Sequence, residues 1–192
     1  MSKSVTVKKI LLVSGLGNPY PYLKTRHNMG QMLLDELVPQ SDFTIHPKHT
    51  NVSLQVNRDY PNVIFMKNLN YMNISGNALI PCWKSYLNKY SNPSQYKIEN
   101  LVIYDELEKE VGKYQLRYGK VSSRGHNGLR NIVNGFGNEF YRLGVGIGRP
   151  GNEKGKGNIA DWVLSEVTDQ DLEVIKWEVV PKIKEIIDEL RK

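Results

Sequence analysis

The sequence is poor in cysteine, in long apolar runs and in signals for secretion, and each shortage excludes a class of protein. Its 192 residues include one cysteine, Cys82, which rules out an internal disulfide and favours a reducing compartment. No run of about eighteen apolar residues occurs, so no membrane-spanning helix is expected. The opening MSKSVTVKKI lacks the apolar core and cleavage site of a secretory signal. We therefore expect a cytoplasmic protein, with a mitochondrial location as the alternative because this stretch is basic and free of acids.

Several catalytic signatures are also missing. The chain has no G-x-S-x-G elbow for a nucleophilic serine, and Cys82 follows Pro81 inside a helix-like segment. Its GLGN turn lacks the G-x-G-x-x-G spacing and a phosphate-loop lysine. Of the four histidines, His46 and His49 lie in a polar stretch without a surrounding pattern of cysteines or acids. A covalent serine or cysteine mechanism and a metal site are therefore not supported.

Positive charge is concentrated in one part of the chain. The formal net charge is +6, and the window from Lys113 to Asn158 holds nine basic residues against two acids, so it carries +7 and the rest −1. A local excess of this kind indicates a polyanionic partner, with RNA or DNA first in line. A solvated basic surface without a partner explains the composition about equally well.

Apolar runs alternate with helix-like segments along the chain. Strands are predicted in KKILLVSG, NVSLQVN, NVIFMKN, LVIYDELE, YQLRY and YRLGVGIG, and helices over about 25–38, 75–90, 127–137 and 168–192. Pro81 should kink the second helix or delay its start, and Pro181 should bend the last. This alternation favours an α/β sandwich with a largely parallel or mixed sheet, and the length favours one compact domain.

Polar motifs stand at the ends of four predicted strands: GLGNP, YMNISG, YDEL and SRGHNG. Ligands of open α/β sheets collect at the carboxyl ends of strands, so these motifs should meet. Taken singly, each has an ordinary structural explanation, such as a glycine turn or a helix N-cap at Asn73 or Asn127. The joint occurrence of His27, Asp105 and three asparagines is harder to explain by chance, and it predicts a polar functional site.

His27 stands in the first turn of a helix predicted to begin near Thr25. The positive end of a helix dipole disfavours imidazolium, so we expect His27 to be neutral near pH 7 and able to act as a general base. A carboxylate such as Asp105 on its other nitrogen would fix the tautomer and stabilise the ring once it is protonated. Nearby asparagines can hold a water, a carbonyl or a ribose without adding charge.

The ordered set GLGNP, TRHN, MNISG, DEL, RGHNGLRNI and RLGVGIGRPG, over roughly Leu11 to Leu164, resembles the bacterial-type peptidyl-tRNA hydrolases. The resemblance implies a single α/β domain over residues 1–192, with a twisted mixed β-sheet flanked by α-helices. It implies hydrolysis of the ester between a peptide and the 3′ end of tRNA, which recycles tRNA from aborted translation. It also implies a monomer that uses no metal or organic cofactor.

The resemblance assigns the catalytic roles by position. His27 is implied as the base that activates water, and Asp105 as the carboxylate that orients it. Asn18 and Asn73 are implied to hold the substrate, and Asn127 to position the water or the peptide backbone.

The resemblance also assigns a binding set, with departures. Tyr22 is implied to lie near the terminal nucleotide, Met72 in the peptide groove and Arg117 at the tRNA end phosphate. The second basic residue of that phosphate site is replaced by Gly144, so Arg142 or Arg124 is expected to substitute. Three further departures concern loops: Tyr20 for the usual glycine, Asn68 for the usual proline, and a longer, more basic loop from Gly119 to Arg124.

Two other functions fit parts of the sequence. A non-catalytic RNA-binding module would account for the basic window, but it has no need of His27, Asp105 and the asparagines. A mononucleotide-binding enzyme using GLGN is the weaker option. Release of tRNA from an N-blocked aminoacyl-tRNA separates the enzyme from the binding module.

Overall fold

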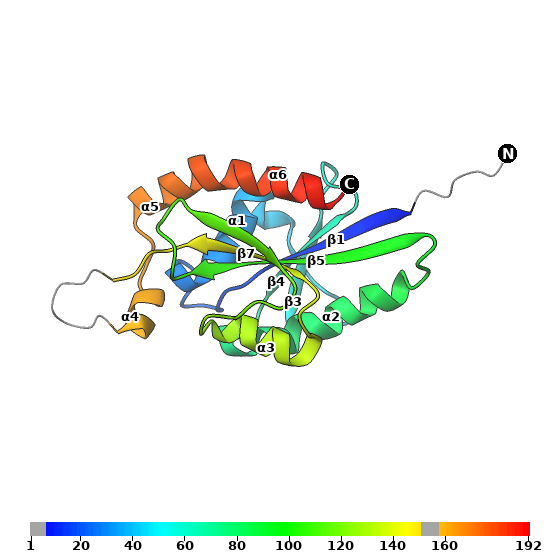
Figure 1. Ribbon diagram of the computed structural model, residues 1–192, viewed down its shortest axis with the longest axis horizontal. Coiled ribbons are helices and arrows are strands. Elements are labelled where there is room, and N and C mark those ends of the chain that lie inside the picture. Colours follow the sequence, from blue (N-terminus) through cyan, green and yellow to red (C-terminus); the bar gives the residue numbers. More distant parts are fainter. Residues whose placement is uncertain (1–6, 151–157) are drawn as a thin grey trace.

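In this computed structural model, which describes residues 7–150 and 158–192, seven strands form one mixed sheet in the order β2-β3-β4-β1-β5-β7-β6 (Figure 1). The strands are β1 Lys8–Gly15, β2 Thr44–Ile45, β3 Val52–Val56, β4 Val63–Asn68, β5 Tyr96–Glu106, β6 Tyr114–Tyr118 and β7 Tyr141–Gly146. Strands β4, β1, β5 and β7 run parallel, and β2, β3 and β6 pair in antiparallel fashion at the edges. The predicted mixed α/β sheet is confirmed.

The central strands are buried on both faces because helices cover both faces. In β1, Leu11 and Val13 join the core cluster on one side of the sheet and Leu12 joins the cluster on the other. Strands of this kind read as continuous apolar runs, which is why the sequence pattern found them. Helices α1 Met29–Leu37, α5 Asp169–Val174 and α6 Val180–Leu190 cover one face (Figure 1). Helices α2 Ser75–Lys89 and α3 Asn127–Phe136 cover the other, and α4 Ile159–Val163 lies near one end of the sheet.

The sequence predicted effects of Pro81 on the second long helix and of Pro181 on the last helix. Helix α2 passes through Pro81 without interruption, so the alternative of a late start after Pro81 is wrong. The predicted C-terminal helix is divided, because a π-helical turn at Ile175–Val179 separates α5 from α6 just before Pro181. Wide turns of this type are a common way to bend a helix. Strand β2 and helix α4 were not predicted, since both are too short to show a period.

The segment around His27 also differs from the prediction. Helix α1 begins at Met29, and a 3-10 turn at Arg26–Asn28 precedes it. The Thr25 hydroxyl donates to the Tyr22 carbonyl oxygen and does not cap the helix. His27 is therefore carried by a separate turn, held by a β-bridge between Thr25 and Glu166.

Strand β6 runs antiparallel to β7, so its last residue, Tyr118, pairs with the first residue of β7, Tyr141. The chain therefore leaves β6 at the end of the sheet that is remote from the carboxyl ends of β1, β4 and β5, and the SRGHNG motif follows from there. The loop from Gly119 to Gly125 has to run back before α3 begins at Asn127. Three of the four polar motifs converge because their strands are parallel, and the fourth arrives through this returning loop.

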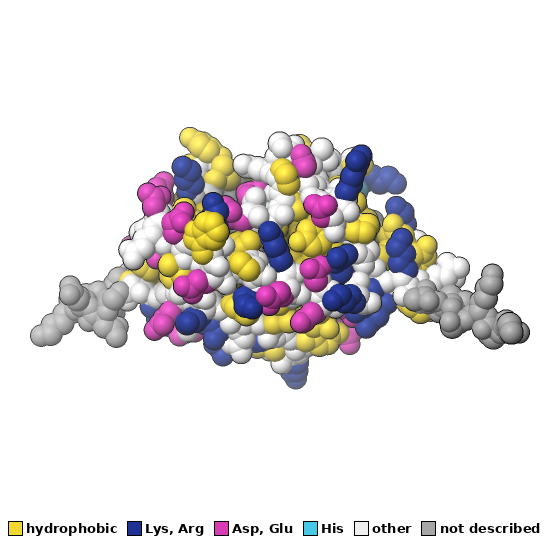
Figure 2. All heavy atoms as spheres, turned by 90° about the horizontal axis from the view of Figure 1, so that it is seen from above, with side chains coloured by type: hydrophobic (Ala, Val, Ile, Leu, Met, Phe, Trp, Pro, Cys, Tyr) yellow, Lys and Arg dark blue, Asp and Glu magenta, His cyan; other side chains and the backbone are white. Residues whose placement is uncertain are grey.

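Figure 2 looks onto the face that carries α6, where basic and acidic side chains are interspersed. Five of the nine basic residues of the window predicted from the sequence lie on β6, the returning loop, α3 and β7: Arg117, Lys120, Arg124, Arg130 and Arg142. Lys154 and Lys156 of that window lie outside the described residues. Within residues 7–150 and 158–192, no helix is long and apolar enough to cross a membrane.

Candidate active site

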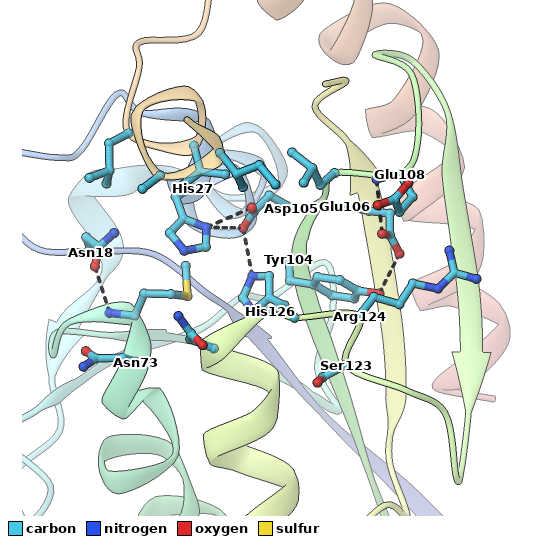
Figure 3. A pocket seen from close by; sticks show the side chains of 18 of the residues that line it. Asn18, His27, Asn73, Tyr104, Asp105, Glu106, Glu108, Ser123, Arg124 and His126 are labelled. Carbon is cyan, nitrogen blue, oxygen red and sulfur yellow. Dashed lines mark hydrogen bonds and ion pairs between the residues drawn. The ribbon is translucent and has the colours of Figure 1, made fainter. Parts of the chain in front are cut away.

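A cavity of about 530 Å³ opens at the carboxyl ends of β1, β4 and β5 (Figure 3). Its polar wall includes Asn18, His27, Asn73, Asp105 and His126. Its apolar wall includes Met72, together with Ile159, Val163 and Leu164 from α4 and the residue after it. The predicted convergence of the strand-end motifs is therefore present in the structure.

Glycines allow the His27 turn to approach the sheet. A Cβ at Gly30 would lie 2.2 Å from the Ile103 carbonyl oxygen, and one at Gly15 would lie 2.4 Å from the Gly30 carbonyl oxygen. Contacts of that length are impossible for real Cβ atoms, so both positions require glycine. The close packing of α1 on β1 and β5 places His27 directly over the end of β5, where Asp105 stands.

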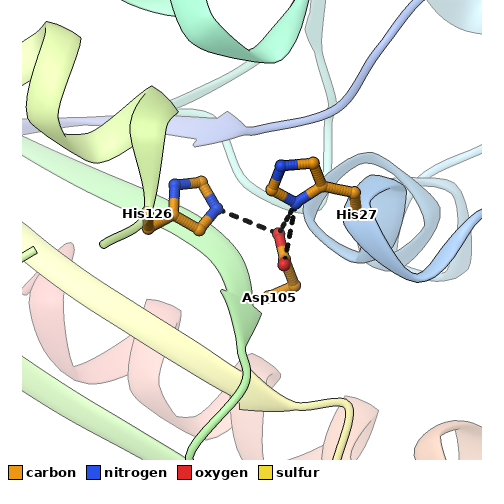
Figure 4. Close-up of side chains that lie close together, drawn as sticks. All are labelled: His27, Asp105 and His126. Carbon is orange, nitrogen blue, oxygen red and sulfur yellow. Dashed lines mark hydrogen bonds and ion pairs between the residues drawn. The ribbon is translucent and has the colours of Figure 1, made fainter. Parts of the chain in front are cut away.

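Asp105 joins two histidines from different elements (Figure 4). Its Oδ2 lies 2.8 Å from Nδ1 of His27, and its Oδ1 lies 3.0 Å from Nε2 of His126. The carboxylate side chain is 3 % exposed, and the histidine side chains are 15 % and 7 % exposed respectively. His126 was not assigned a role from the sequence; its place directly before Asn127 in RGHNG was the available signal.

The tautomers of both rings follow from their partners. Nδ1 of His126 accepts the backbone N–H of Leu129 and caps helix α3, so the proton of a neutral His126 is on Nε2 and is donated to Asp105. An ionised Asp105 can only accept, so Nδ1 of His27 carries the proton of that contact. The Nε2 lone pair of His27 is left free, on the side of the ring away from Asp105 (Figure 4).

The pKa of Asp105 reflects a contest between burial and its partners. Burial raises the pKa of this carboxyl, but the charges of His27 and His126 and their hydrogen bonds lower it more, and the net pKa lies well below the ordinary value. Burial likewise lowers the pKa of His27, while the charge and hydrogen bond of Asp105 raise it, and the net pKa lies above 6.5. The expectation that the helix end would hold His27 neutral is wrong in direction, because the adjacent carboxylate outweighs a dipole at the start of α1.

Asn18 is fixed by a network around the GLGN turn. Its Oδ1 accepts the backbone N–H of Met72 at 2.8 Å, which leaves its Nδ2 as a donor at the cavity. The Asn18 backbone exchanges two hydrogen bonds of 2.8 Å with the buried side chain of Asn28. The residue after His27 therefore positions Asn18, a link that the sequence did not reveal.

The other two predicted asparagines also line the cavity and are exposed to it. Asn73 lies in the 3-10 turn Met72–Ile74, which precedes α2. Asn127 is the first residue of α3, and its Oδ1 accepts a hydrogen bond from Arg130. Of the binding residues predicted for the peptide groove, Met72 is buried and forms part of the wall.

Tyr22 and Arg117 do not line the cavity. Tyr22 lies in the loop after β1, where its carbonyl accepts from Thr25, and the exposed Tyr20 nearby is likewise outside the cavity lining. The Arg117 guanidinium donates to Glu106 at 2.9 Å and to the Tyr104 hydroxyl at 3.3 Å, with its side chain 10 % exposed. Because Glu106 is buried, Arg117 is needed to neutralise it, which opposes the predicted phosphate role.

Arg142 cannot substitute in a phosphate site, contrary to the expectation. It is 1 % exposed, donates to the carbonyl of Val121 and to Asn138, and stacks on Phe140 at 4.6 Å. It ties the returning loop to the sheet. Gly144 stands where the resemblance expects the second basic residue of the phosphate site. A Cβ on Gly144 would lie 2.8 Å from the Tyr104 hydroxyl oxygen, so the cluster of Tyr104, Glu106 and Arg117 occupies the space that a longer side chain would need.

Asn68, another departure, has a structural role. Its Nδ2 donates to the Gly17 carbonyl at 3.0 Å, and its Oδ1 accepts the Gly17 N–H at 3.3 Å. The amide of Gln31 donates to the Asn68 carbonyl at 2.6 Å. These bonds join the end of β4 to the GLGN turn, so this side chain helps to hold Asn18 in place.

The α4 wall is anchored beside His27 by Arg26. This buried guanidinium donates to Asp171 at 2.9 Å and to Ser165 at 3.3 Å, and it stacks on the Trp162 ring at 4.1 Å. Arg26 therefore links the turn that carries His27 to the segment that forms the apolar side of the cavity.

Among the described residues, His27, Asp105 and His126 form the one group of three side chains close enough to be considered as metal ligands, with their ligand atoms within 4.8 Å of one another. The hydrogen bonds favour a different use. Two ring N–H groups already point at the carboxylate, and a metal ion would have to displace both protons. The arrangement is suited to orienting a histidine base.

A mixed α/β sheet with a histidine–carboxylate pair at its strand ends, beside a cavity lined with amides, defines an α/β enzyme of the hydrolytic type. The family model described as peptidyl-tRNA hydrolase matches residues 12–192. The chain belongs to the peptidyl-tRNA hydrolase family.

Individual relatives agree with this assignment. The peptidyl-tRNA hydrolase of Rickettsia conorii is 36 % identical over 169 residues, covering 86 % of this chain and 85 % of the relative. The peptidyl-tRNA hydrolase of Saccharomyces cerevisiae is 34 % identical over 174 residues, covering 86 % and 88 %. The crystal structure of peptidyl-tRNA hydrolase from Acinetobacter baumannii superposes with a TM-score of 0.68 at 27 % identity, covering 100 % of this chain and 97 % of that one.

Proposed function

We propose that this protein hydrolyses the ester that joins a peptide to the 3′-terminal ribose of tRNA, with His27 as the general base. Family membership supports the reaction and its substrate. The observation that carries the mechanism is the contact of Nδ1 of His27 with the Asp105 carboxylate, which leaves Nε2 free.

In this mechanism, Nε2 of His27 removes a proton from a water molecule as that water attacks the ester carbonyl carbon. Asp105 keeps the ring in the required tautomer and stabilises the imidazolium that forms. The tetrahedral intermediate then expels the ribose oxygen, which takes the proton back from His27. The products are a peptide with a free carboxyl group and a tRNA with a free ribose hydroxyl, and the histidine returns to its starting state.

The asparagines supply uncharged donors for the developing negative charge. Asn18 presents Nδ2 because its Oδ1 is held by Met72, and this fixed orientation costs no reorganisation during the reaction. Asn73 and Asn127 line the same cavity from the turns before α2 and at the start of α3. We assign them to the carbonyl and to the attacking water.

The two sides of the cavity differ in chemistry, which orients the substrate. Ile159, Val163 and Leu164 with Met72 form an apolar side that suits a peptide of varied sequence. The basic returning loop lies on another side and suits the tRNA. The ester would then lie between them, at His27.

For the state of the protein, we propose one domain over residues 1–192 that acts as a monomer. We propose a cytoplasmic location, with a mitochondrial one as the alternative. The single, buried Cys82 suits either reducing compartment.

The test is release of free tRNA from N-acetyl-aminoacyl-tRNA. We expect turnover by the wild-type protein and a loss of about 10²–10⁴-fold in kcat for His27→Ala, with tRNA binding retained. His49→Ala is the matched control, since His49 lies outside the cavity, and it should retain wild-type turnover. Binding of tRNA without release by the wild-type protein would support the RNA-binding module instead, and full activity of His27→Ala would overturn the role of His27.

A further inference from the structure

Tyr104 is a buried tyrosine beside the two histidines, and it has no part in the proposed mechanism. It stands on β5 directly before Asp105, is 4 % exposed and lines the cavity. Its ring meets the ring of His126 in a T-shaped arrangement, with the ring centroids 5.2 Å apart and the planes at 80°. Tyr104 is therefore the aromatic neighbour of the histidine that donates to Asp105.

An ion pair holds the hydroxyl end of the Tyr104 ring. The hydroxyl donates to Oε2 of Glu106 at 3.3 Å and accepts from the Arg117 guanidinium at 3.3 Å. Burial and the charge of Glu106 raise the pKa of Tyr104 to about 12, so the hydroxyl stays neutral and able to donate near pH 7. In Figure 3, the ring spans the distance between His126 and Glu106, and it is thus held at both ends.

Gly144 makes room for this tyrosine. It pairs with Tyr104 across the boundary between β5 and β7. A Cβ on Gly144 would lie 2.8 Å from the Tyr104 hydroxyl oxygen and 3.0 Å from the ring carbon Cζ. The glycine that departs from the family pattern therefore allows the hydroxyl end of the ring to pack directly on the backbone of β7.

We propose that Tyr104 is a positioning residue for ester hydrolysis, because its anchored ring keeps His126 in the orientation that donates to Asp105. The inference rests on the proposed function, in which Asp105 orients the His27 base. His126 makes two hydrogen bonds in the plane of its ring, to Asp105 at 3.0 Å and from Leu129 at 3.2 Å. Such bonds leave the ring free to tilt about the line that joins its nitrogens. An aromatic ring packed against it restrains that tilt.

Removal of the Tyr104 ring should weaken the hydrogen bond from His126 to Asp105. For Tyr104→Leu we expect kcat to fall about tenfold with KM hardly changed. The loss should be equal on N-acetyl-aminoacyl-tRNA and on N-acetyl-aminoacyl-adenosine, a minimal substrate that contains the ester but no tRNA body. The acidic limb of the pH profile of kcat/KM should move upward, because a less stabilised Asp105 carboxylate attracts the His27 imidazolium more strongly.

Two further variants define which part of Tyr104 is needed. Tyr104→Phe keeps the ring and loses only the hydroxyl, so it should retain most of the wild-type kcat and pH profile. Removal of a buried ring can unfold a protein, and Tyr104→Met is therefore the second variant without a ring, since its flexible side chain adapts to the space that is left. It should behave as Tyr104→Leu does.

A double-mutant cycle separates positioning from packing. If Tyr104 acts through His126, Tyr104→Leu should have no further effect on kcat or on the acidic limb in a His126→Ala background. A role in packing alone would reduce kcat by the same factor in both backgrounds.

Tyr86→Leu is the matched control. Tyr86 packs on the same core cluster as Tyr104 and also forms a T-shaped contact with a histidine, His46, but it lies outside the cavity. Its replacement should lower the melting temperature and leave kcat and the pH profile unchanged.

Three results would overturn the proposal: a wild-type kcat and pH profile in a folded variant without the ring, equal losses of kcat with and without His126, or a loss confined to KM for the tRNA substrate. An NMR titration of the imidazole nitrogens tests the same contact without catalysis, and the pKa of His27 should be higher in Tyr104→Leu than in the wild type. If the wild-type protein releases no tRNA, the proposed function fails, and this titration still decides the role of Tyr104.

Discussion

Asp105 accepts a hydrogen bond from Nε2 of His126 at 3.0 Å while its carboxylate also contacts His27. The same His126 ring caps helix α3 through its Nδ1. The start of α3 and the orientation of the proposed base are therefore linked through one buried carboxylate. Substitutions at Asp105 and His126 should shift the pH dependence of activity in opposite directions.

Replacement of Asp105 by Asn should lower kcat by about 10²–10⁴-fold, because an amide can force the wrong tautomer on His27. Asp105 raises the pKa of His27 above 6.5, and burial alone lowers it. Activity that needs neutral His27 should thus fall as the pH drops through a range above 6.5 in the wild type, and at lower pH in Asp105→Asn. A pH profile of kcat/KM measures this, and an unmoved acidic limb would contradict the pairing.

Replacement of His126 by Ala should move the acidic limb upward. Loss of one donor leaves the Asp105 carboxylate less stabilised, so it attracts the His27 imidazolium more strongly. The lost cap of α3 should also lower the free energy of unfolding by about 1 kcal/mol. His126→Gln can still donate to Asp105 and should restore part of the wild-type pH profile. Identical profiles for the Ala variant and the wild type would show that His126 is only structural.

Replacement of Arg26 by Ala should lower the free energy of unfolding by about 2–3 kcal/mol, since a charged donor to Asp171 and Ser165 is lost from a buried site. It should also raise KM, because the α4 wall loses the anchor that stacks on Trp162. Denaturant unfolding and steady-state kinetics measure the two effects. The exposed pair of Lys182 with Glu185 supplies the control, and Lys182→Ala should hardly change either quantity.

Replacement of Gly30 by Ala should be severe, at about 2 kcal/mol or more, because the new Cβ meets the Ile103 carbonyl and the Leu16 backbone. Separation of α1 from β5 would also move His27 away from Asp105 and reduce kcat. Gly135→Ala in α3 is the matched control, since its Cβ meets only the movable end of Ile80. Equal effects of the two substitutions on the melting temperature would refute the packing argument.

Much of the fold was predictable, for identifiable reasons. The buried central strands produce continuous apolar runs, as in β1, and the long helices α1, α2 and α3 have regular apolar stripes. Parallel strands place their carboxyl ends at one edge, so the meeting of Asn18, Asn73 and Asp105 follows from topology alone. Short elements such as β2 and α4 were missed because a few residues cannot display a period.

The charges were the harder part, because the state of a charged side chain depends on neighbours that are distant along the chain. Arg117 and Arg142 look like free cations in the sequence, yet one neutralises the buried Glu106 and the other is itself buried. His27 was expected to be governed by a nearby helix end, and its pKa is instead governed by burial and Asp105. Arg124 was named from the sequence, but its positive φ is a property of the folded loop alone. Local patterning and motif order thus specify the elements, the family and the residues of the site. Folding alone brings His27, Asp105 and His126 together and selects which cations stay free, since electrostatic energies depend on distances and burial that arise only in the packed chain.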